Sequence, residues 1–374
     1  MPESIRIADR LIGDGQPCFV IAEAGVNHNG SLDMAKALID VAAAAGADTV
    51  KFQTFRANDV ISRHAPKAEY QTRATGAAEG QLEMVRKLEL SEVAHETLIA
   101  HARANDIGFL STPFDLSSLH LLTQKIGLET IKISSGEITN APFLLEIART
   151  GCKAILSTGM STLGEVEMAL GVLAFGYLGM DADSRPGMEA FAAAFATDAG
   201  QAALHSHVAL LHCTTEYPAP YGEVNLKAID TLRQAFGLPV GLSDHSPGIH
   251  IPVAAVARGA QIIEKHFTLD RTLPGPDHAA SLEPTELKTM VQAIRDVEAA
   301  FGDGVKRPTA TERKNRDAAR RSLVAARPIR AGHFFGSEDL TAKRPGTGLS
   351  PLEYWNCLGQ PASRDYLADE EIEP

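Results

Sequence analysis

Carboxylate, ammonium and imidazole side chains stand within or at the ends of short apolar segments. Glu23 follows the segment FVIA, and Lys51 lies within TVKFQT. Lys132 lies within TIKISSGE, while His245 and His266 end the segments VGLSDH and IIEKH. Such groups, once brought together, can bind a phosphate or carboxylate, hold a metal ion or transfer a proton. The chemistry therefore depends on a fold that gathers these separate segments at one place.

The segments belong to a regular alternation of strand-like and helix-like patterns between residues 18 and 302. Runs rich in β-branched residues predict eight strands: CFVIAE, TVKFQT, FLSTPF, TIKISSGE, AILSTGM, VALLHCTT, VGLSDH and IIEKHFTL. Apolar residues at three- and four-residue spacing predict helices at 31–45, 91–105, 115–126, 141–150, 163–175, 225–236, 249–258 and 285–300. This alternation indicates consecutive βα units and a parallel sheet.

Eight strands favour a closed (β/α)₈ TIM barrel over an open doubly wound sheet. An open sheet usually has fewer strands, and no GxGxxG motif follows the first strand here. In a barrel the strand ends meet at the C-terminal mouth, which is where catalytic residues lie. Two longer inserts, at 56–88 and 177–206, interrupt the rhythm, and we expect them to form loops over this mouth.

The stretch EAGVNHNG at 23–30 combines a carboxylate with a turn signal. Asn-Gly pairs are strong turn formers, so we interpret NHNG as a turn in which His28 needs no chemical role. Glu23 is different, because it lies where the first strand reaches the mouth. We expect Glu23 to take part in the chemistry.

Lys51 and Lys132 lie inside apolar strands, where a charge is costly unless it meets a partner or a ligand. One interpretation is an anion site, in which Ser135, Ser157 and backbone N–H groups of the turn STGM at 157–160 join the lysines. A second is that one lysine forms a Schiff base, as in an aldolase.

A third interpretation of the two lysines is structural. Barrel interiors contain buried ion pairs, and Glu23 or Glu137 could neutralise Lys51 or Lys132 without any ligand. The presence of two such lysines at neighbouring strand ends favours ligand binding over this interpretation.

His245 and His266 end neighbouring strands, so both imidazoles can face one divalent ion, with Glu23 or water completing the site. Each histidine taken alone is more typical of a hydrogen-bonded structural residue. Asp277, in the loop LPGPDH, is a candidate gate or anchor for substrate hydroxyls, with a surface turn as the alternative. Arg344, in KRPGTG, can recognise an amide or carboxylate if it is not simply solvated.

Composition restricts the class of protein. The chain has 374 residues and a formal charge of −12, which disfavours binding to nucleic acid or an anionic membrane. It has no apolar run of the roughly 20 residues that span a membrane, and four scattered cysteines suit free thiols in the cytoplasm. The polar, basic stretch after Gly302 predicts a boundary, giving a catalytic barrel at 1–302, a linker at 303–321 and a small β-rich module at 322–374.

The chain resembles the sialic acid (nonulosonate) synthases over nearly its whole length. The resemblance rests on motifs in a fixed order: IAEAGVNHNGSLDMAK, AGADTVKFQTF, STPFD, KISSGE, LSTGM, YPAP with VNL, GLSDHS, IEKHFTLDR with GPDH and SLEP, and SLVAARPI with LTAKRPGTGLSP. It implies a TIM barrel followed by an antifreeze-like SAF domain, in a domain-exchanged homodimer. Members of this family condense phosphoenolpyruvate with the open-chain aldehyde of an N-acetylated mannosamine-type sugar and release phosphate.

The resemblance also implies roles for individual positions. His245 and His266 would hold a Mn²⁺-type ion, with Mg²⁺ or Co²⁺ as alternatives, and Glu23 would stabilise an oxocarbenium-like state or manage a proton. Arg344 would come from the partner subunit to recognise the N-acetyl group. The expected contacts to phosphoenolpyruvate are Lys51, Thr112, Lys132, Ser135 and Ser157, and those to the sugar are Gln53, Tyr217 and Asp277. Glu137 and Ser243 complete the predicted substrate-binding set.

The sequence leaves the identity of the sugar substrate open. The insert at 177–206, KAEYQ at 67–71 and QLEM at 81–84 are more like those of legionaminate synthases, and the first motif differs from that of pseudaminate synthases. N-acetylmannosamine and its 2,4-diacetamido-2,4,6-trideoxy analogue remain alternatives, and a sugar phosphate is a third. A Schiff-base aldolase and a non-catalytic sugar-binding relative are the competing functions.

Overall fold

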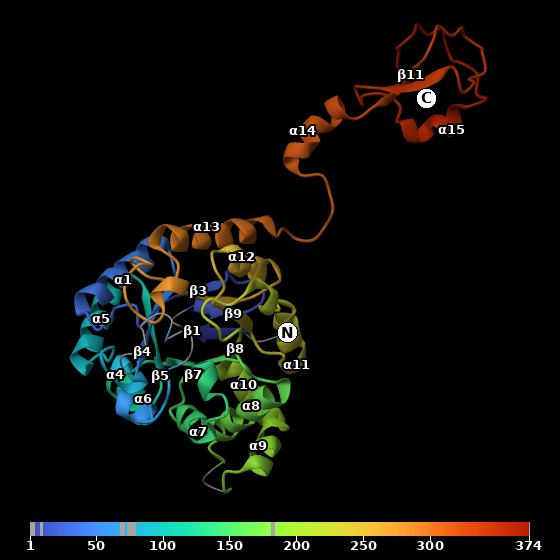
Figure 1. Ribbon diagram of the computed structural model, residues 1–374. Coiled ribbons are helices and arrows are strands. Elements are labelled where there is room, and N and C mark those ends of the chain that lie inside the picture. The colour runs from blue at the N-terminus through green and yellow to red at the C-terminus, as the bar shows by residue number, and fades with distance from the viewer. Residues whose placement is uncertain (1–3, 8–9, 68–71, 73–79, 181–183, 374) are drawn as a thin grey trace. The chain divides into compact units, whose positions relative to one another are not determined.

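The computed structural model describes residues 4–7, 10–67, 72, 80–180 and 184–373, which form two compact units, Met1–Phe301 and Gly302–Pro374 (Figure 1). The first unit contains the alternating strands and helices, and the second is small and rich in turns. Each unit has a hydrophobic core of its own.

A parallel eight-stranded barrel forms the centre of the first unit. Its hydrogen-bonded order is β5-β4-β3-β10-β9-β8-β7-β6, and the two end strands, β5 and β6, pack side by side. The strands are β3 (Phe19–Gly25), β4 (Thr49–Thr54), β5 (Gly108–Pro113), β6 (Thr130–Ile133), β7 (Lys153–Ser157), β8 (Val208–Cys213), β9 (Val240–Asp244) and β10 (Ile262–His266). The predicted TIM-barrel architecture and its strands are confirmed.

Helices form a layer around the strands (Figure 1). The longer ones are α1 (Leu32–Ala45), α5 (Glu92–Ala104), α7 (Ala141–Arg149), α8 (Leu163–Tyr177), α9 (Met188–Phe195), α10 (Asp198–His207), α11 (Lys227–Phe236), α12 (His250–Ala257) and α13 (Pro284–Ala300). Shorter elements are α2 (Ala57–Val60), α4 (Gln81–Arg86), α6 (Leu116–His120), the π-helix η1 (Leu121–Lys125), and the 3₁₀ turns η2 (Ser135–Glu137), η4 (Tyr221–Glu223) and η5 (His278–Ala280).

Local sequence explains how these helices begin and end. The Ser31 hydroxyl accepts a hydrogen bond from Met34 N and caps the start of α1. Gly46 ends the helix with φ 80°, a left-handed conformation that glycine adopts without strain. Leu38 and Ile39 lie on the buried face of α1, which packs on the barrel as its apolar spacing predicts.

A short antiparallel hairpin covers the N-terminal end of the barrel and was not predicted. It consists of β1 (Ile5–Ile7) and β2 (Arg10–Ile12). The buried side chains of Ile5, Ile7 and Ile12 share one cluster with residues near the starts of the barrel strands, among them Phe19 and Ile262. The hairpin therefore keeps this end of the barrel apolar and leaves the opposite mouth for polar side chains.

The prediction that both inserts are loops is wrong for 177–206. That segment contains α9 and α10, which pack against α8, and α10 also packs against β1. Its mixture of Gly, Pro and acidic residues obscured the helical periodicity of the Ala-rich parts. In 56–88 the described residues include α2 and α4, whereas residues 68–71 of KAEYQ lie outside the described part of the chain.

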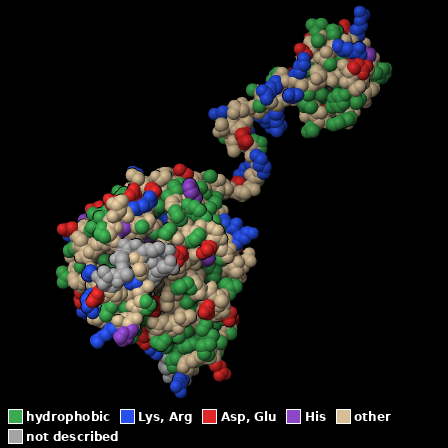
Figure 2. Space-filling view, viewed as in Figure 1, with side chains coloured by type: hydrophobic (Ala, Val, Ile, Leu, Met, Phe, Trp, Pro, Cys, Tyr) green, Lys and Arg blue, Asp and Glu red, His purple; other side chains and the backbone are tan. Residues whose placement is uncertain are grey.

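The second unit begins with a helix, α14 (Ala310–Ala319), which has no buried residue and lies within the predicted linker at 303–321. It continues with the antiparallel pair β11 (Ser322–Ala325) and β12 (Leu340–Lys343), the 3₁₀ turn η6 (Pro351–Glu353) and α15 (Tyr354–Cys357). Figure 2 shows hydrophobic atoms gathered on one side of this unit, whose exposed apolar side chains include Phe334, Leu352, Trp355 and Leu367. Among the described residues, no helix is long and apolar enough to cross a membrane.

Candidate active site

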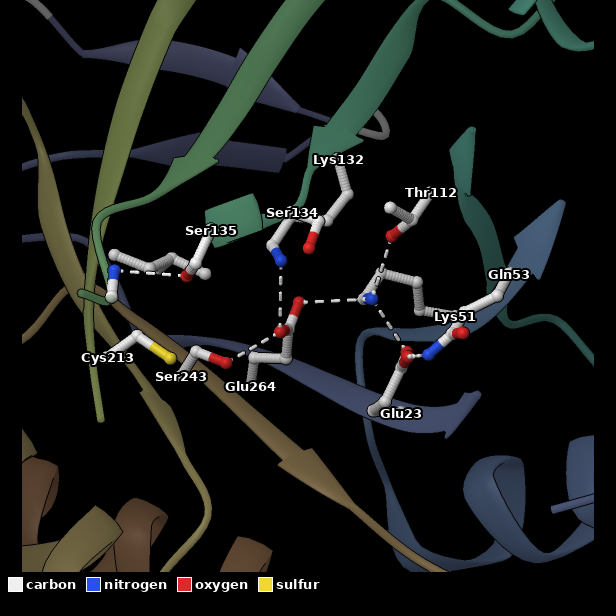
Figure 3. Close-up of polar contacts among 12 residues, drawn as sticks. Glu23, Lys51, Gln53, Thr112, Lys132, Ser134, Ser135, Cys213, Ser243 and Glu264 are labelled. Atoms are coloured by element: carbon white, nitrogen blue, oxygen red, sulfur yellow. Dashed lines mark hydrogen bonds and ion pairs between the residues drawn. The ribbon is translucent and has the colours of Figure 1, made fainter. Parts of the chain in front are cut away.

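Two lysines and two glutamates form a buried cluster inside the barrel, which we call the charge quartet: Glu23, Lys51, Lys132 and Glu264 (Figure 3). Lys51 Nζ lies 2.8 Å from Glu23 Oε2 and 3.5 Å from Glu264 Oε2. Lys132 Nζ lies 3.3 Å from Glu264 Oε1. All four residues are at most 5% exposed, so the charges balance one another away from bulk water.

Strand register brings these side chains together. In the β3–β4 ladder Glu23 lies beside Lys51, and in the β10–β3 ladder His266 lies beside Glu23. Glu264 and His266 are two residues apart on β10, so they point to the same face of the sheet. Lys265, between them, points the other way and pairs with Asp244. The barrel interior thus receives one acid and one imidazole from β10.

The quartet changes the ionisation of its own members. Burial raises the pKa of Glu23 to about 7, although the Lys51 ammonium opposes this shift. For Glu264 burial would also raise the pKa, but Lys132 and Lys51 outweigh it and hold the pKa well below its usual range. Burial lowers the pKa of Lys132, whereas for Lys51 the carboxylates of Glu23 and Glu264 overcome burial and raise the pKa.

Hydroxyl groups surround the quartet. Thr112 accepts a hydrogen bond from Lys51 Nζ at 3.0 Å, and Ser243 donates to Glu264 Oε1 at 2.7 Å. Ser135 Oγ accepts from the backbone N–H of Gly159 at 3.0 Å. The Ser157 hydroxyl is buried with no hydrogen-bond partner among the described residues, so it is available to a ligand.

Gly159 is required by the close packing of these hydroxyls. A Cβ atom at this position would lie 2.3 Å from Thr215 Oγ1 and 2.8 Å from Ser135 Oγ. Any side chain here would displace these hydroxyls, so the turn STGM needs glycine at this position. Its role as an anion-binding turn stays a prediction.

Glu264 is the member of the quartet that was not among the predicted site residues. The signal was present in IIEKH, where Glu264 and His266 alternate on one face. Glu137 was considered as the acidic partner of a lysine, but its carboxylate accepts a hydrogen bond from Asn140 Nδ2 at 2.7 Å, and Lys132 pairs with Glu264 instead. The proposed contact of Glu137 with substrate stays a prediction.

His245, His266 and Tyr217 form an aromatic group beside the quartet. The ring centroids of the two histidines are 5.3 Å apart with planes at 64°, and Tyr217 stacks on His245 at 4.1 Å. Asp277 is buried nearby, with Oδ2 3.9 Å from His266 Nδ1. The predicted neighbourhood of these residues is therefore present in the structure.

Hydrogen bonding selects the protonation state of this group. His245 Nδ1 lies 2.7 Å from the carbonyl oxygen of Thr214 and donates to it, so the neutral ring carries its lone pair on Nε2. Burial opposes protonation of His245, but Cys213 and the Thr214 carbonyl outweigh it and raise the pKa. Burial and the neighbouring His245 lower the pKa of His266 well below its usual value, and its Nδ1 has no hydrogen-bond partner among the described residues. Burial raises the pKa of Asp277 to about 6.

Gln53 and Arg344 complete the predicted set, in different places. Gln53 Nε2 donates to Glu23 Oε1 at 3.3 Å, so it lies beside the quartet. Arg344 belongs to the second unit, where it is exposed and its Nε donates to the carbonyl of Ala319 at 3.0 Å. Every other predicted site residue lies in the first unit, within the barrel strands or in the segments that follow their C-terminal ends.

Comparison with known proteins decides the family. Residues 38–306 match the model of the NeuB family, and residues 320–373 match the SAF domain. The chain belongs to the NeuB family. The expected SAF domain and the expected resemblance to sialic acid synthases are both confirmed.

Similar proteins share nearly the whole length of the chain. The N,N'-diacetyllegionaminic acid synthase of Campylobacter jejuni is 51% identical over 354 residues, which is 95% of this chain and 98% of the relative. The synthase of the same name from Legionella pneumophila is 44% identical over 95% of this chain and 93% of the relative. The crystal structure of N-acetylneuraminic acid synthetase from Leptospira borgpetersenii matches with a TM-score of 0.69 and 34% identity, over 84% of this chain and 95% of that one.

We expect Glu264→Gln to reveal the anion affinity of the charge quartet. Removing one partner of a buried ion pair costs about 3–5 kcal/mol, because Lys132 keeps an uncompensated charge. Inorganic phosphate should supply the missing anion, so the melting temperature of the variant should rise more steeply with phosphate than that of the wild type. Thermal melts across a phosphate series measure this difference.

Glu92→Gln is the matched control, because Glu92 also pairs with a lysine, Lys125, but on the surface. An exposed ion pair contributes about 0–1 kcal/mol, so this variant should follow the wild type at every phosphate concentration. Identical phosphate responses of Glu264→Gln and wild type would contradict an anion site at the two lysines.

Proposed function

We propose that this protein is a nonulosonate synthase that condenses phosphoenolpyruvate with 2,4-diacetamido-2,4,6-trideoxymannose to give N,N'-diacetyllegionaminate and phosphate. The observation that carries the proposal is the charge quartet with its surrounding hydroxyls, a site suited to an anionic substrate. The choice of sugar is supported by the 51% identity to a synthase of that name. N-acetylmannosamine is the alternative sugar.

Phosphoenolpyruvate would bind between Lys51 and Lys132. Its carboxylate and phosphate offer the lysines new anionic partners, and the Thr112 hydroxyl lies 3.0 Å from the Lys51 ammonium group. The proposed hydroxyl donors are Thr112, Ser135 and Ser157, and the backbone N–H of Gly159 holds the Ser135 hydroxyl in place. These donors would also stabilise charge on the departing phosphate.

The reaction forms one carbon–carbon bond and breaks one carbon–oxygen bond. C3 of phosphoenolpyruvate attacks the sugar aldehyde, whose oxygen takes up a proton, and positive charge develops at C2. Water adds to C2, and the bond between C2 and the phosphate oxygen then breaks. The carboxylate of Glu23, held between Lys51 and Gln53, would stabilise the charge at C2 or accept the proton of the water.

His245 and His266 fit a divalent metal ion. His245 directs Nδ1 to a carbonyl and leaves Nε2 for a ligand, and His266 has a buried nitrogen without a hydrogen-bond partner among the described residues. The described chain holds no group of three or more His, Cys, Asp or Glu side chains suited to a metal, so substrate or water would have to complete the coordination. A Mn²⁺-type ion bound there, or Mg²⁺ or Co²⁺, would polarise the aldehyde.

The sugar would contact Gln53, Tyr217 and Asp277, which lie on the same side as the imidazoles. We also propose a homodimer in which Arg344 of one chain reaches the barrel of the other to recognise an N-acetyl group. The exposed apolar side chains of the second unit support this, because such a surface favours docking against protein.

We propose that the chain divides into a catalytic barrel at 1–302, a linker at 303–321 and the SAF domain at 322–374. We also propose that the protein is cytoplasmic, because its four cysteines are free thiols.

A Schiff-base aldolase is the second candidate, and one observation favours it. Burial lowers the pKa of Lys132, which is a property of lysines that form Schiff bases. Borohydride would trap such an adduct in the presence of a carbonyl substrate, whereas the synthase forms no covalent bond with lysine.

Product analysis tests the proposed function. The purified enzyme is given phosphoenolpyruvate and Mn²⁺ with either N-acetylmannosamine or its 2,4-diacetamido-2,4,6-trideoxy analogue, and products are identified by mass spectrometry. We expect a higher kcat/KM for the analogue, phosphate release, and loss of activity after chelation that returns with metal. A preference for N-acetylmannosamine would change the sugar, activity after exhaustive chelation would exclude the metal, and no phosphate release with either sugar would exclude the synthase.

We expect Glu23→Gln to bind phosphoenolpyruvate but to lose turnover. Glutamine keeps the size of the side chain and can still contact Gln53, but it cannot carry the negative charge or accept a proton. Binding of phosphoenolpyruvate measured by calorimetry should change less than about tenfold, whereas kcat should fall by about 10²- to 10⁴-fold. Turnover within a few-fold of the wild type would contradict the role given to Glu23.

Mixing two inactive variants tests the proposed exchange of domains. We expect Glu23→Gln and Arg344→Ala homodimers to be impaired separately, whereas a mixed dimer regains up to one complete site. In that site the barrel of Arg344→Ala supplies Glu23, and the partner chain supplies Arg344. Activity is measured after co-refolding or co-expression of differently tagged chains, and no recovery in purified mixed dimers would place Arg344 in cis.

A further inference from the structure

The loop that carries Asp277 has little regular structure of its own. Residues 269–281 follow β10 and contain LPGPDH and the short turn η5. Yet Asp277 is 8% exposed and its carboxylate faces His266. A loop rich in Gly and Pro needs outside contacts to hold one side chain so far inside the protein.

Asn27, at the end of β3, bridges both ends of this loop. Its Nδ2 donates to the carbonyl of Phe267 at 2.8 Å and to Ser281 Oγ at 2.9 Å. Ser281 Oγ in turn donates to the backbone carbonyl of Asp277 at 2.7 Å. One buried amide group thus ties the first strand to the start and the end of the loop, and through Ser281 to Asp277 itself.

Asn29 holds the middle of the loop through His278, the neighbour of Asp277. His278 Nε2 lies 3.2 Å from Asn29 Oδ1, and His278 Nδ1 lies 2.6 Å from Thr268 Oγ1. Because an amide oxygen only accepts, Nε2 carries the proton, and Nδ1 accepts from the threonine hydroxyl. The imidazole is therefore held on both sides.

Left-handed backbone conformations and glycines allow the turn at 26–30 to pack closely against its neighbours. Asn29 has φ 49° and Gly30 φ 77°, left-handed values that Asn and Gly tolerate best. A Cβ at Gly30 would lie 2.4 Å from Lys87 O, and one at Gly275 would lie 2.9 Å from Asn29 Oδ1. Gly275 thus permits the close approach of the loop to Asn29, whereas Gly30 permits an approach to Lys87, which lies outside the loop.

We propose that the turn NHNG is a strut that positions Asp277 for the sugar, with Asn27 and Asn29 as its positioning residues. This inference rests on the proposed function of Asp277 as a sugar contact. The strut reaches the sugar side of the site, and among the described residues the hydrogen bonds of Asn27 and Asn29 go to the loop and its flanks, not to Lys51 or Lys132. It therefore acts on the second substrate and leaves the anion half of the site unchanged.

Asn29→Gly tests the strut, because glycine accepts φ 49° while the amide oxygen is lost. We expect the KM for the sugar to rise about tenfold, the effect of about one hydrogen bond, with the KM for phosphoenolpyruvate changed less than about twofold. Asn29→Asp keeps an acceptor for His278 and should stay near the wild type. Asp106→Gly is the control, since it removes a side chain at φ 54° before β5, at the opposite end of the barrel.

A double-mutant cycle with Asp277→Ala shows whether the strut acts through Asp277. In that background we expect Asn29→Gly to raise the sugar KM no further. An unchanged sugar KM in the single variant, an equal rise in both substrate KM values, or a full additional rise in the Asp277→Ala background would each overturn the proposal.

Hydrogen exchange measured by mass spectrometry gives a second readout that needs no turnover. Exchange in peptides covering 269–281 should quicken in Asn29→Gly and not in Asp106→Gly, with the barrel strands unchanged. If the wild type makes no nonulosonate but this exchange pattern appears, the strut stands and the proposed function fails. Unchanged exchange at 269–281 would overturn the strut whatever the activity.

Discussion

The burial of two lysines inside a barrel is the constraint on which the rest of this structure depends. An ammonium group removed from water is strongly destabilising unless a carboxylate or a ligand neutralises it. The chain provides one glutamate for each lysine, and both glutamates come from strands adjacent in the sheet, β3 and β10. The result is a site in which opposite charges offset one another, and its two lysines can still bind an anionic ligand.

The balance of charge in the quartet depends on the geometry of the whole barrel. The pairs form only if β3, β4 and β10 keep their register, since a shift by one residue would turn each side chain to the other face. The hairpin at the N-terminal end fills that end with isoleucines, so the polar residues are confined to the mouth. The apolar packing at the N-terminal end of the barrel thus stabilises the fold, whereas the buried charges at the mouth contribute less to its stability.

Much of the fold and of the site could be predicted from the sequence. Alternating patterns predicted the eight strands, and barrel geometry then predicted that Glu23, Lys51, Lys132, His245 and His266 meet. Which acid pairs with which lysine could not be predicted, because pairing depends on distances across strands. The sequence offered Glu23 or Glu137 as partners, and the structure pairs Lys51 with Glu23 and Lys132 with Glu264. The hairpin was missed because strands of three residues give too short a pattern, and α9 and α10 because their Ala-rich sequence lacks a strong apolar stripe.

NHNG shows a further limit of the same kind. Its turn was predicted correctly from the Asn-Gly pair, but the partners of Asn27 and Asn29 lie some 240 residues later in the chain. The residues of a turn do not indicate which residues so far away in the sequence it will contact. The role of such a segment becomes visible only when the barrel closes and brings β3 beside β10.

The two halves of the site are built in different ways, and this bears on how relatives named for different acids can share one fold. The anion half consists of side chains on strands, where the quartet, Thr112 and Ser243 depend on one another. The sugar half that we propose has Tyr217 and Asp277 on loops, an arginine that we place on another domain, and only Gln53 on a strand. A change on a loop leaves the buried charge balance intact, whereas a change on a strand leaves a charge unpaired. We therefore expect that relatives with different sugar preferences differ in the loops, whereas the residues that we propose to bind phosphoenolpyruvate stay the same.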